Sequence, residues 1–294
     1  NMPLGRARYT LICNESGSII DDTIVYRLEE ERFLIVPNAA NADEVLSWIN
    51  QWKNTWAIPV ALRVLTEETS LIAVQGPNAR EILQPVCSMD LSLVRPFRCV
   101  EGRVSDAPAI VCRTGYTGED GYEISVAAPD AEKLARRLLA ESEVLPAGLG
   151  ARDSLRLEAG LCLYGHDIDK TTTPVEASLS WVLGKRRREE GGFPGAGIIL
   201  DQLKTGAAKK RVGLKPDGKS LARDHTAVEN DAGEVIGEVT SGGYGPSVEG
   251  PIAMGYVKTE YASPETPVNL RVRGKALPGS VVKLPFVDQR YYKS

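Results

Sequence analysis

The chain has 294 residues, 43% of them hydrophobic, and a formal net charge of −4 at neutral pH. This length and composition can bury a substantial core and predict a soluble globular protein of roughly two domains. The net charge argues against a broad nucleic-acid surface, which needs a basic field to neutralise phosphates. No run approaches ~20 apolar residues and no charged-then-apolar signal opens the chain, so neither a membrane span nor secretion is predicted.

The cysteines and histidines also exclude some chemistry. The chain has only two histidines, His166 and His225, far apart in sequence, which gives poor support to a His-based metal site or a Ser-His-Asp triad. The five cysteines are scattered without a C-x-x-C pair, which predicts buried, reduced thiols in an intracellular protein. They are Cys13, Cys87, Cys99, Cys112 and Cys162.

The first two thirds of the chain alternates between predicted strands and helices. Alternating or continuous apolar runs predict strands over residues 7–13, 23–26, 32–36, 60–65, 70–74 and 122–126. Apolar residues at helical spacing predict helices over residues 41–52, 78–83, 129–141 and 147–160. Asn41 is expected to cap the first of these helices. The first three strands predict a β-meander.

From about residue 209 the texture changes to short strands and turns. The strands are predicted over residues 211–214, 233–240, 252–257, 267–272 and 279–284. They indicate a small all-β domain, either a barrel or a jelly roll, and place a domain boundary between residues 1–204 and 205–294. Two glycine-rich stretches, 191–197 and 241–247, fit neither G-x-G-x-x-G nor a Gly-Lys-Ser/Thr ending, so both are predicted to be loops.

Residues 113–125 read R-T-G-Y-T-G-E-D-G-Y-E-I-S beside the apolar run 109–112. Glycine allows the backbone to approach a ligand closely, tyrosine offers a stacking face, and carboxylates accept hydrogen bonds. A ligand-shaping loop is one interpretation, and a hairpin with polar decoration is the other.

Arg152 and Arg156 lie one helical turn apart within A-R-D-S-L-R-L-E-A-G. Guanidinium groups on one helix face suit a bound carboxylate, which they can grip bidentately. The alternative is that they form structural ion pairs with Asp153, Glu158 or Glu123.

Several spaced blocks together carry a family resemblance. They are Ile20-Asp-Asp22 with Tyr26, the R-T-G-Y-T-G-E-D-G-Y-E block, A-R-D-S-L-R-L-E-A-G-L-C-L-Y-G from Ala151, T-T-P-V-E-A-S-L-S-W from Thr172, Phe193-Pro-Gly195, Val239-Thr-Ser-Gly242, Ala253-Met-Gly-Tyr256 and the Tyr291-Tyr292 end. The chain resembles the glycine cleavage system T-protein family along essentially its whole length. It departs from the family at its start, where roughly the first quarter of the family pattern is expected to be absent.

The resemblance implies an α+β fold with two interleaved folate-binding units that include a ferredoxin-like element. A C-terminal antiparallel β-barrel or jelly roll completes a cloverleaf arrangement. It also implies transfer of the one-carbon unit of an aminomethyl group from the lipoyl arm of H-protein to tetrahydrofolate. The products are 5,10-methylenetetrahydrofolate, ammonia and dihydrolipoyl H-protein. Tetrahydrofolate is the implied co-substrate, with no metal, nucleic acid or membrane involved. The expected location is the bacterial cytoplasm, or the mitochondrial matrix in a eukaryote.

The resemblance assigns the catalytic role to Asp22, whose alternative interpretation is a turn aspartate beside Asp21. The residues that it assigns to folate binding are Tyr9, Tyr26, Asn38, Tyr116, Glu123, Arg152 and Tyr291. Among these, Glu123 is expected at the pterin's amino and N–H edge and Arg152 near the glutamyl carboxylates. Arg156 and Trp181 are expected to be supporting structure.

The dense basic run is Lys185, Arg186, Arg187 and Arg188. It is interpreted either as a solvated loop or as a docking site for an acidic H-protein, which complementary charge would steer. Three other functions remain open: a folate-dependent demethylase, a noncatalytic folate-binding relative, and the folate domain of a larger dehydrogenase. The sequence lacks the Lys-Gly-Cys-Tyr type motif that noncatalytic relatives carry. It also lacks the dinucleotide fingerprint of a larger dehydrogenase.

Overall fold

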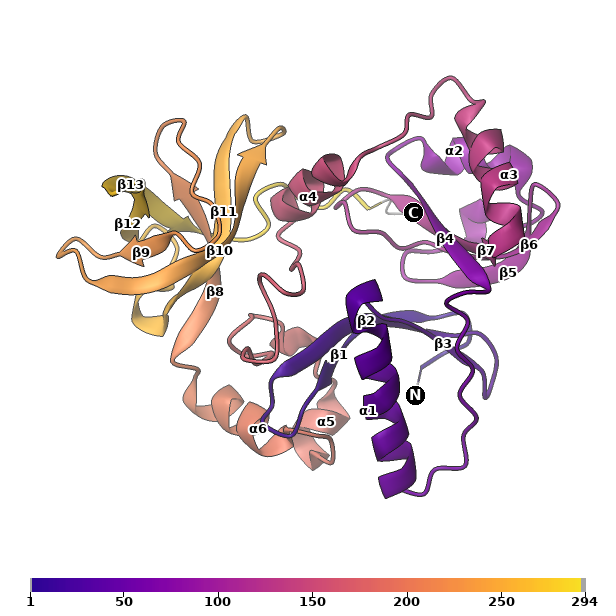
Figure 1. The fold of residues 1–294 in the computed structure, drawn as a ribbon, viewed down its shortest axis with the longest axis horizontal. Coiled ribbons are helices and arrows are strands. Elements are labelled where there is room, and N and C mark those ends of the chain that lie inside the picture. Colours follow the sequence, from indigo (N-terminus) through magenta and orange to yellow (C-terminus); the bar gives the residue numbers. More distant parts are fainter. Residues whose placement is uncertain (1, 292–294) are drawn as a thin grey trace.

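The structure, a computed structural model, describes residues 2–291 and consists of three lobes (Figure 1). The chain begins in the first lobe, leaves it to build the second, and returns to the first before it forms the third. The expected α+β class and the cloverleaf arrangement of interleaved units with a C-terminal barrel are confirmed.

The first lobe contains a three-stranded antiparallel sheet with the order β1-β2-β3. Its elements are β1 (Ala7–Cys13), β2 (Ile19–Arg27), β3 (Phe33–Val36), the 3-10 helix η1 (Ala39–Asn41), α1 (Ala42–Thr55), and, after the chain returns, the 3-10 helix η4 (Ser180–Val182), α5 (Lys185–Glu190) and α6 (Ala196–Thr205). The predicted meander and first helix are confirmed. The Asn41 side chain does not cap α1, because its amide instead donates to Asp21 Oδ1 at 2.7 Å.

The second lobe contains a four-stranded antiparallel sheet with the order β4-β7-β6-β5. Its elements are β4 (Thr69–Gln75), α2 (Ala79–Leu83), η2 (Gln84–Val86), η3 (Leu91–Leu93), β5 (Cys99–Val104), β6 (Ala107–Cys112), β7 (Gly121–Ala127) and α3 (Ala128–Leu139). Leu83, Tyr122, Ile124 and Leu134 are buried in its core. The ferredoxin-like element is not found in this sheet, because β5, β6 and β7 follow one another as a meander and no helix separates β6 from β7.

The third lobe is a closed barrel with the strand order β10-β11-β8-β13-β12-β9. Its strands are β8 (Lys209–Pro216), β9 (Ala227–Glu229), β10 (Val235–Gly245), β11 (Gly250–Lys258), β12 (Pro267–Val272) and β13 (Lys275–Val282), with the 3-10 helix η5 (Thr259–Tyr261) after β11. Closure gives every strand two neighbours, so the lobe has no open sheet edge. The sequence allowed a barrel or a jelly roll, and the structure is the barrel.

Three local predictions are wrong. The strand predicted over residues 60–65 is irregular, because these residues find no ladder partner in the described part of the chain and Val60 and Val64 lie exposed. The glycine-rich stretch 241–247 is mostly strand, since β10 extends to Gly245 and pairs with β11 through residue 250. The basic run 185–188 is not a loop, because it forms the first turn of α5.

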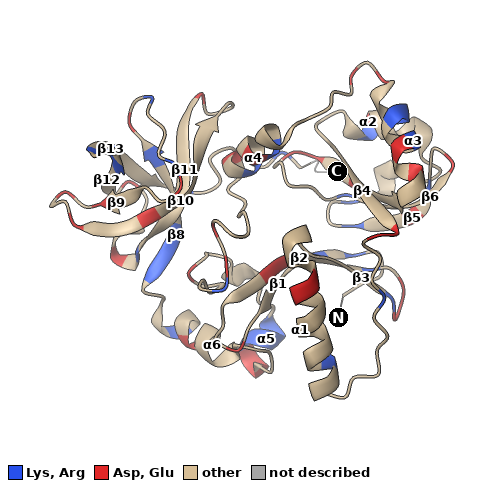
Figure 2. Cartoon of the chain, viewed as in Figure 1, with Lys and Arg blue, Asp and Glu red and all other residues tan. Residues whose placement is uncertain are grey.

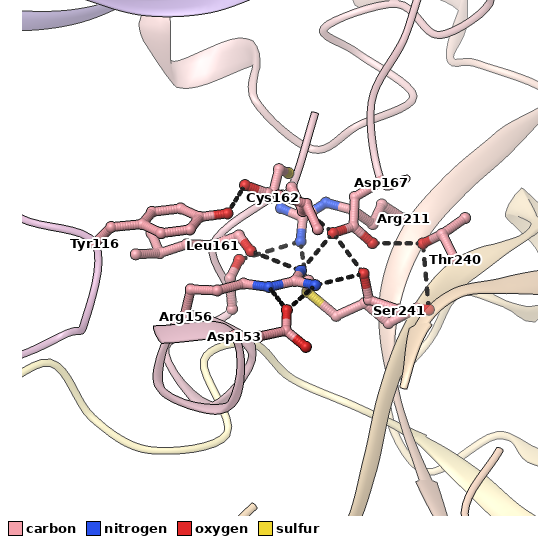
Figure 3. Close-up of polar contacts among 12 residues, drawn as sticks. Tyr116, Asp153, Arg156, Leu161, Cys162, Asp167, Arg211, Thr240 and Ser241 are labelled. Atoms are coloured by element: carbon pink, nitrogen blue, oxygen red, sulfur yellow. Dashed lines mark hydrogen bonds and ion pairs between the residues drawn. The ribbon is translucent and has the colours of Figure 1, made fainter. Parts of the chain in front are cut away.

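A buried polar network joins α4 (Leu149–Glu158) to the barrel (Figure 3). Arg156 is 3% exposed and its Nη1 lies 2.7 Å from Asp167 Oδ2. Ser241 in β10 donates to the same Asp167 oxygen at 2.9 Å and accepts from Arg156 Nη2 at 2.9 Å. Thr240 donates to the other Asp167 oxygen at 2.6 Å. Separating this buried ion pair would leave two charges without partners, which is strongly unfavourable. The pair therefore fixes α4 to the barrel wall.

A second set of contacts fixes the end of α4. The Glu158 carboxylate is 3% exposed and accepts from the Ser247 backbone N–H at 2.6 Å and from the Ser247 hydroxyl at 2.9 Å. The Glu158 carbonyl accepts from the backbone N–H groups of Phe286 and Val287 at 2.9 and 3.0 Å. The C-terminal segment is thereby held against α4, between the barrel and the second lobe (Figure 1).

We predict that Asp167→Asn lowers the free energy of unfolding by about 3 kcal/mol, because it leaves the Arg156 guanidinium buried without its carboxylate. Glu132→Gln is the control, since Glu132 pairs with Arg136 on the exposed face of α3 and such pairs contribute at most about 0.5 kcal/mol. Chemical denaturation measures both changes. Equal free energies of unfolding for the two variants would contradict the prediction.

Candidate functional site

The strand register of the first lobe gathers three of the predicted site residues on one face. Asp22 and Tyr26 lie four residues apart on β2, and alternation puts both on the same side of the sheet. Tyr9 on β1 lies directly opposite Ile24, between them. The Tyr9 hydroxyl donates to Asp22 Oδ2 at 2.9 Å. Asp22 is therefore a strand residue facing an aromatic partner, and the turn interpretation is wrong.

Asn38 completes the surroundings of the Asp22 carboxyl group. Its amide nitrogen Nδ2 lies 2.8 Å from Asp22 Oδ1 and 3.0 Å from the Asp22 carbonyl oxygen. Burial disfavours the charged form and raises the pKa of Asp22 to about 6, although the hydrogen bonds from Tyr9 and Asn38 act in the opposite direction. The Asp22 carboxyl group thus titrates close to neutral pH.

Asp21 shares the Asn38 amide with Asp22, because Asn38 Nδ2 also lies 2.9 Å from Asp21 Oδ1. It is fully buried, and its carboxylate accepts from the Asn38 backbone N–H at 3.1 Å and from the Asn41 amide at 2.7 Å. These bonds fix the turn that carries Asn38. Asp21 was predicted only as a neighbour of Asp22, although its alternation with Asp22 already implied the opposite face.

The R-T-G-Y-T-G-E-D-G-Y-E block connects β6 to β7. Arg113 closes the loop with a bidentate pair to Asp120, at 2.9 Å from Nε to Oδ1 and 2.6 Å from Nη2 to Oδ2. A side chain at Gly115 would place its Cβ 1.9 Å from Gln75 Oε1, so the Gln75 amide, which donates to the Thr114 and Tyr122 carbonyls, would have to move. The block is therefore a hairpin connection with polar side chains, as one interpretation predicts, and the ligand-shaping role stays a prediction.

Thr114 joins two predicted folate-binding residues from different lobes. Its hydroxyl donates to Glu123 Oε2 at 2.5 Å and lies 3.3 Å from the Tyr26 hydroxyl. The second Glu123 oxygen accepts no hydrogen bond from the described residues. The sequence does not single out Thr114, because a threonine in a glycine-rich loop has no distinctive spacing. Its one signal is a hydroxyl group in a block that also contains two tyrosines.

Tyr116 and Arg152 form a second group at the end of the same loop. The Tyr116 hydroxyl donates to the Cys162 carbonyl oxygen (Figure 3), and the Arg152 guanidinium lies over the Tyr116 ring, 4.7 Å from its centroid. Arg152 forms no ion pair with any residue in the range 2–291, whereas Arg156 is paired with Asp153 and Asp167. The two arginines therefore have different roles, with Arg156 structural and Arg152 available to an anion.

Electrostatics link the two groups, and an aromatic contact adds Tyr291. Burial raises the pKa of Tyr116; the positive charge of Arg156 lowers it, and the negative charges of Asp22 and Asp167 raise it. Tyr291 packs edge-on against Phe97 at 6.4 Å between ring centroids, and Phe97 packs against the cluster that contains Tyr26. The predicted site residues thus converge on one region between the first two lobes and α4, while Tyr292 lies outside the described residues.

Trp181 is a further residue of this region that was predicted to be supporting structure. Its ring stacks on the Tyr9 ring at 5.6 Å and 20°, yet the residue is 64% exposed. It therefore covers the outer side of Tyr9 rather than filling a core.

The basic run lies on α5 (Figure 2), which follows the short helix η4 that contains Trp181. Arg187 donates to the Gly192 carbonyl at 2.8 Å, and Arg188 donates to the Leu183 and Ser180 carbonyls at 2.8 and 2.7 Å. Lys185 is 87% exposed and lies 3.7 Å from Glu189. Arg186 has no ion pair with a described residue. The run therefore divides into two structural arginines and two exposed cations.

A cavity of about 410 Å³ lies elsewhere in the first lobe, between α1, β1 and residues 182–199. Apolar side chains line most of it, among them Trp48, Trp52, Trp56 and Phe193. None of the predicted catalytic and folate-binding residues lines it, although Arg187 of the basic run does. In the range 2–291, no group of three or more His, Cys, Asp or Glu side chains is arranged to hold a metal ion. The described helices include none with the length and apolar character that crossing a bilayer requires.

We predict that Tyr9→Phe raises the pKa of Asp22 above about 6, because the lost hydrogen bond favoured the carboxylate. Carboxyl carbon NMR, with Asp22→Asn to assign the signal, measures the midpoint. Tyr244→Phe, at an exposed tyrosine of the barrel, is the control and should leave the midpoint unchanged. A midpoint in Tyr9→Phe at or below the parent value would contradict the prediction.

Comparisons with known proteins match nearly the whole chain to one family. The GCVT N-terminal domain matches residues 1–187, and the glycine cleavage T-protein C-terminal barrel domain matches residues 209–288. The chain is 46% identical over 296 residues to "Aminomethyltransferase, mitochondrial" of Flaveria trinervia, covering 98% of this chain and 72% of the relative. The corresponding protein of Dictyostelium discoideum is 43% identical over 309 residues, covering 99% of this chain and 75% of the relative.

A solved structure leads to the same family. The crystal structure of glycine cleavage system aminomethyltransferase T from Bartonella henselae superposes with a TM-score of 0.91 at 40% identity, covering 99% of this chain and 79% of that chain. With two family domains that together span nearly all of its length, the chain belongs to the glycine cleavage T-protein family.

Proposed function

We propose that the chain is an aminomethyltransferase of the glycine cleavage system. It moves the one-carbon unit of the aminomethyl group on lipoylated H-protein to tetrahydrofolate, with release of ammonia and formation of 5,10-methylenetetrahydrofolate. Family membership and the relatives' names support this reaction. The observation that carries it is the occurrence of a half-buried, hydrogen-bonded Asp22, a half-satisfied Glu123 and an unpaired Arg152 in one region.

The residues fit tetrahydrofolate at both of its ends. A pterin presents amino and N–H donors along one edge, and the unpaired Glu123 oxygen is an acceptor for them. The glutamyl tail carries carboxylates, which a guanidinium without an internal partner can bind bidentately. Tyr26 and Tyr116 supply aromatic surface between these ends. We propose that Tyr9, Asn38 and Tyr291 line the same site.

Asp22 is proposed to supply the proton chemistry. Tetrahydrofolate, when bound, provides the nitrogen atoms that take up the one-carbon unit. As the Asp22 pKa is about 6, the group is mostly a carboxylate at neutral pH and still a competent proton acceptor. Its negative charge can balance positive charge that develops on the transferred carbon. Tyr9 and Asn38 keep its two oxygens in fixed positions.

We predict that Asp22→Asn lowers kcat about 100-fold and leaves the tetrahydrofolate Kd nearly unchanged, because the amide keeps the shape of the carboxyl group but cannot accept the proton. Ammonia release from aminomethylated H-protein measures kcat, and calorimetry measures Kd. The activity of the parent should rise with pH around the Asp22 pKa of about 6, since the carboxylate is the active form.

Glu123→Gln is the matched variant, with the opposite pattern expected. It should weaken tetrahydrofolate binding about tenfold, the effect of one hydrogen bond to a charged group, with a smaller change in kcat. Equal kcat values for Asp22→Asn and the parent would refute the catalytic role. Tetrahydrofolate binding without turnover of H-protein would indicate a noncatalytic relative, and turnover of a methylated sulfur or nitrogen donor would indicate a demethylase.

H-protein docking is proposed for the exposed end of α5. Lys185 and Arg186 are solvent-facing cations beside Trp181, and Trp181 stacks on Tyr9 at the proposed catalytic group. An acidic partner seated there would bring its lipoyl arm toward Asp22. Its encounter would be steered by charge and weakened by salt. The enzyme would act in the compartment that holds H-protein, the bacterial cytoplasm or the mitochondrial matrix.

We predict that the double variant Lys185→Gln/Arg186→Gln raises the KM for H-protein about threefold and flattens its dependence on ionic strength. The variant leaves Arg187 and Arg188 in place because they hold backbone carbonyls. Lys219→Gln/Arg273→Gln, at exposed positions of the barrel, controls for the loss of two charges. The docking proposal fails if both double variants show the same KM and the same salt slope.

A further inference from the structure

Two cysteines lie directly opposite each other beneath the proposed folate site. Cys99 is the first residue of β5 and Cys112 is the last residue of β6, and the strand register pairs them. Both are free thiols, with exposures of 9% and 2%.

The hydrogen-bond pattern determines which kind of cross-strand pair they form. The Arg113 N–H donates to the Arg98 carbonyl at 2.8 Å, so the neighbouring Arg98–Arg113 pair is the hydrogen-bonded one. The Cys99 N–H instead points away from β6 and donates to Gly5 at 2.8 Å. Cys99 and Cys112 are therefore a non-hydrogen-bonded pair, whose Cα atoms lie about 4.5 Å apart with both side chains on one face. Disulfides bridge Cα separations of about 4.4–6.8 Å.

The two thiols differ in character. The Cys112 thiol hydrogen-bonds to Cys99 and lowers the pKa of Cys99. The same contact, together with burial, raises the pKa of Cys112. Burial alone raises the pKa of Cys13 to about 12 and that of Cys87 to about 11. Cys99 is thus the thiol of the pair that more readily becomes the nucleophile, and Cys112 is placed to resolve it.

The pair touches the folate-binding residues. Tyr26 packs with both cysteines in one buried cluster, and Cys112 is the direct ladder partner of Glu123 on β7. Forming an S–S bond of about 2.05 Å requires the two sulfurs to move closer together. That movement changes the packing against Tyr26 and the strand that carries Glu123.

We propose that Cys99 and Cys112 form a reversible disulfide under hydrogen peroxide and that this disulfide weakens tetrahydrofolate binding. The second half of the proposal rests on the function proposed above. The Cys99 thiolate attacks one peroxide oxygen, the O–O bond breaks, and hydroxide leaves with a sulfenic acid formed. The Cys112 sulfur then attacks the Cys99 sulfur, forming the S–S bond and expelling the oxygen as water. The two thiols lose two electrons and two protons in total, and the peroxide becomes two waters.

The test uses the full chain, reduced and then treated with hydrogen peroxide. Free thiols are blocked with N-ethylmaleimide, and the protein is digested with trypsin. Cleavage after Arg98, Arg103 and Arg113 separates the two cysteines into peptides 99–103 and 104–113. Mass spectrometry should find these peptides linked. Calorimetry should find tetrahydrofolate bound about fivefold more weakly to the oxidised protein, the effect of roughly one hydrogen bond, with full recovery in dithiothreitol.

Two variants separate the pair from the remaining thiols. Cys99→Ser should abolish both the linked peptides and the loss of affinity, whereas Cys87→Ser, at a thiol away from the site, should retain both. Peptide mapping of the parent protein shows whether the disulfide forms even where Cys99→Ser does not fold.

The proposal is overturned if peroxide yields only unlinked or over-oxidised peptides, or if linked peptides form without a change in affinity. A protein that binds tetrahydrofolate in neither redox state counts against the proposed function and against the binding half of this proposal. In that case the linked peptides alone still decide whether the disulfide forms.

Discussion

The buried ion pair between Arg156 and Asp167 is the contact on which the arrangement of the lobes depends. Arg156 projects from α4, and Asp167 lies in the segment that returns to the first lobe. Ser241 on the barrel forms hydrogen bonds with both side chains. The Cys162 carbonyl, in the same returning segment, accepts from the Tyr116 hydroxyl of the second lobe. Because a charge pair desolvated to this extent cannot be opened cheaply, the three lobes are held at one relative position. Arg152, one turn before Arg156 on the same helix, is placed over Tyr116 by the same constraint.

The fold also carries an unfavourable feature at Asp22. A carboxyl group whose folded pKa of about 6 lies above its ordinary 3.8 binds its proton more tightly in the folded state. Its contribution to stability is therefore greatest below the unfolded value and is lost as pH rises through the folded one. The hydrogen bonds from Tyr9 and Asn38 offset part of this loss by favouring the carboxylate. Groups with strongly shifted pKa values are often found at functional sites. The burial that destabilises the ionised form of such a group also brings its pKa closer to neutral pH.

Much of the fold could be predicted from the sequence because most elements bury one face. The strands 7–13 and 70–74 and the helix 129–141 have periodic apolar residues that match their observed positions. The secondary-structure predictions are wrong where a segment's structure depends on whether another strand pairs with it. Residues 60–65 are as apolar as a strand but have no ladder partner among the described residues. Residues 241–247 have the composition of a loop, yet pairing with β11 keeps them extended as far as Gly245. The strand propensity of a segment indicates neither that residues 60–65 lack a partner nor that residues 241–245 pair with β11.

The site shows the same limit at the level of single side chains. Motif resemblance could name Tyr26 and Glu123, but not the Thr114 hydroxyl that joins them across a sequence separation of nearly a hundred residues. Likewise, Cys99 and Cys112 counted as two of five scattered cysteines until the β5–β6 register made them neighbours. The Thr114 contacts depend on how the loop after β6 packs against the sheet of the first lobe. The cysteine pair depends on which residues the β5–β6 ladder places opposite each other, and a shift of one residue would turn each side chain to the other face. Strand register therefore determines the site residues as strictly as residue identity does.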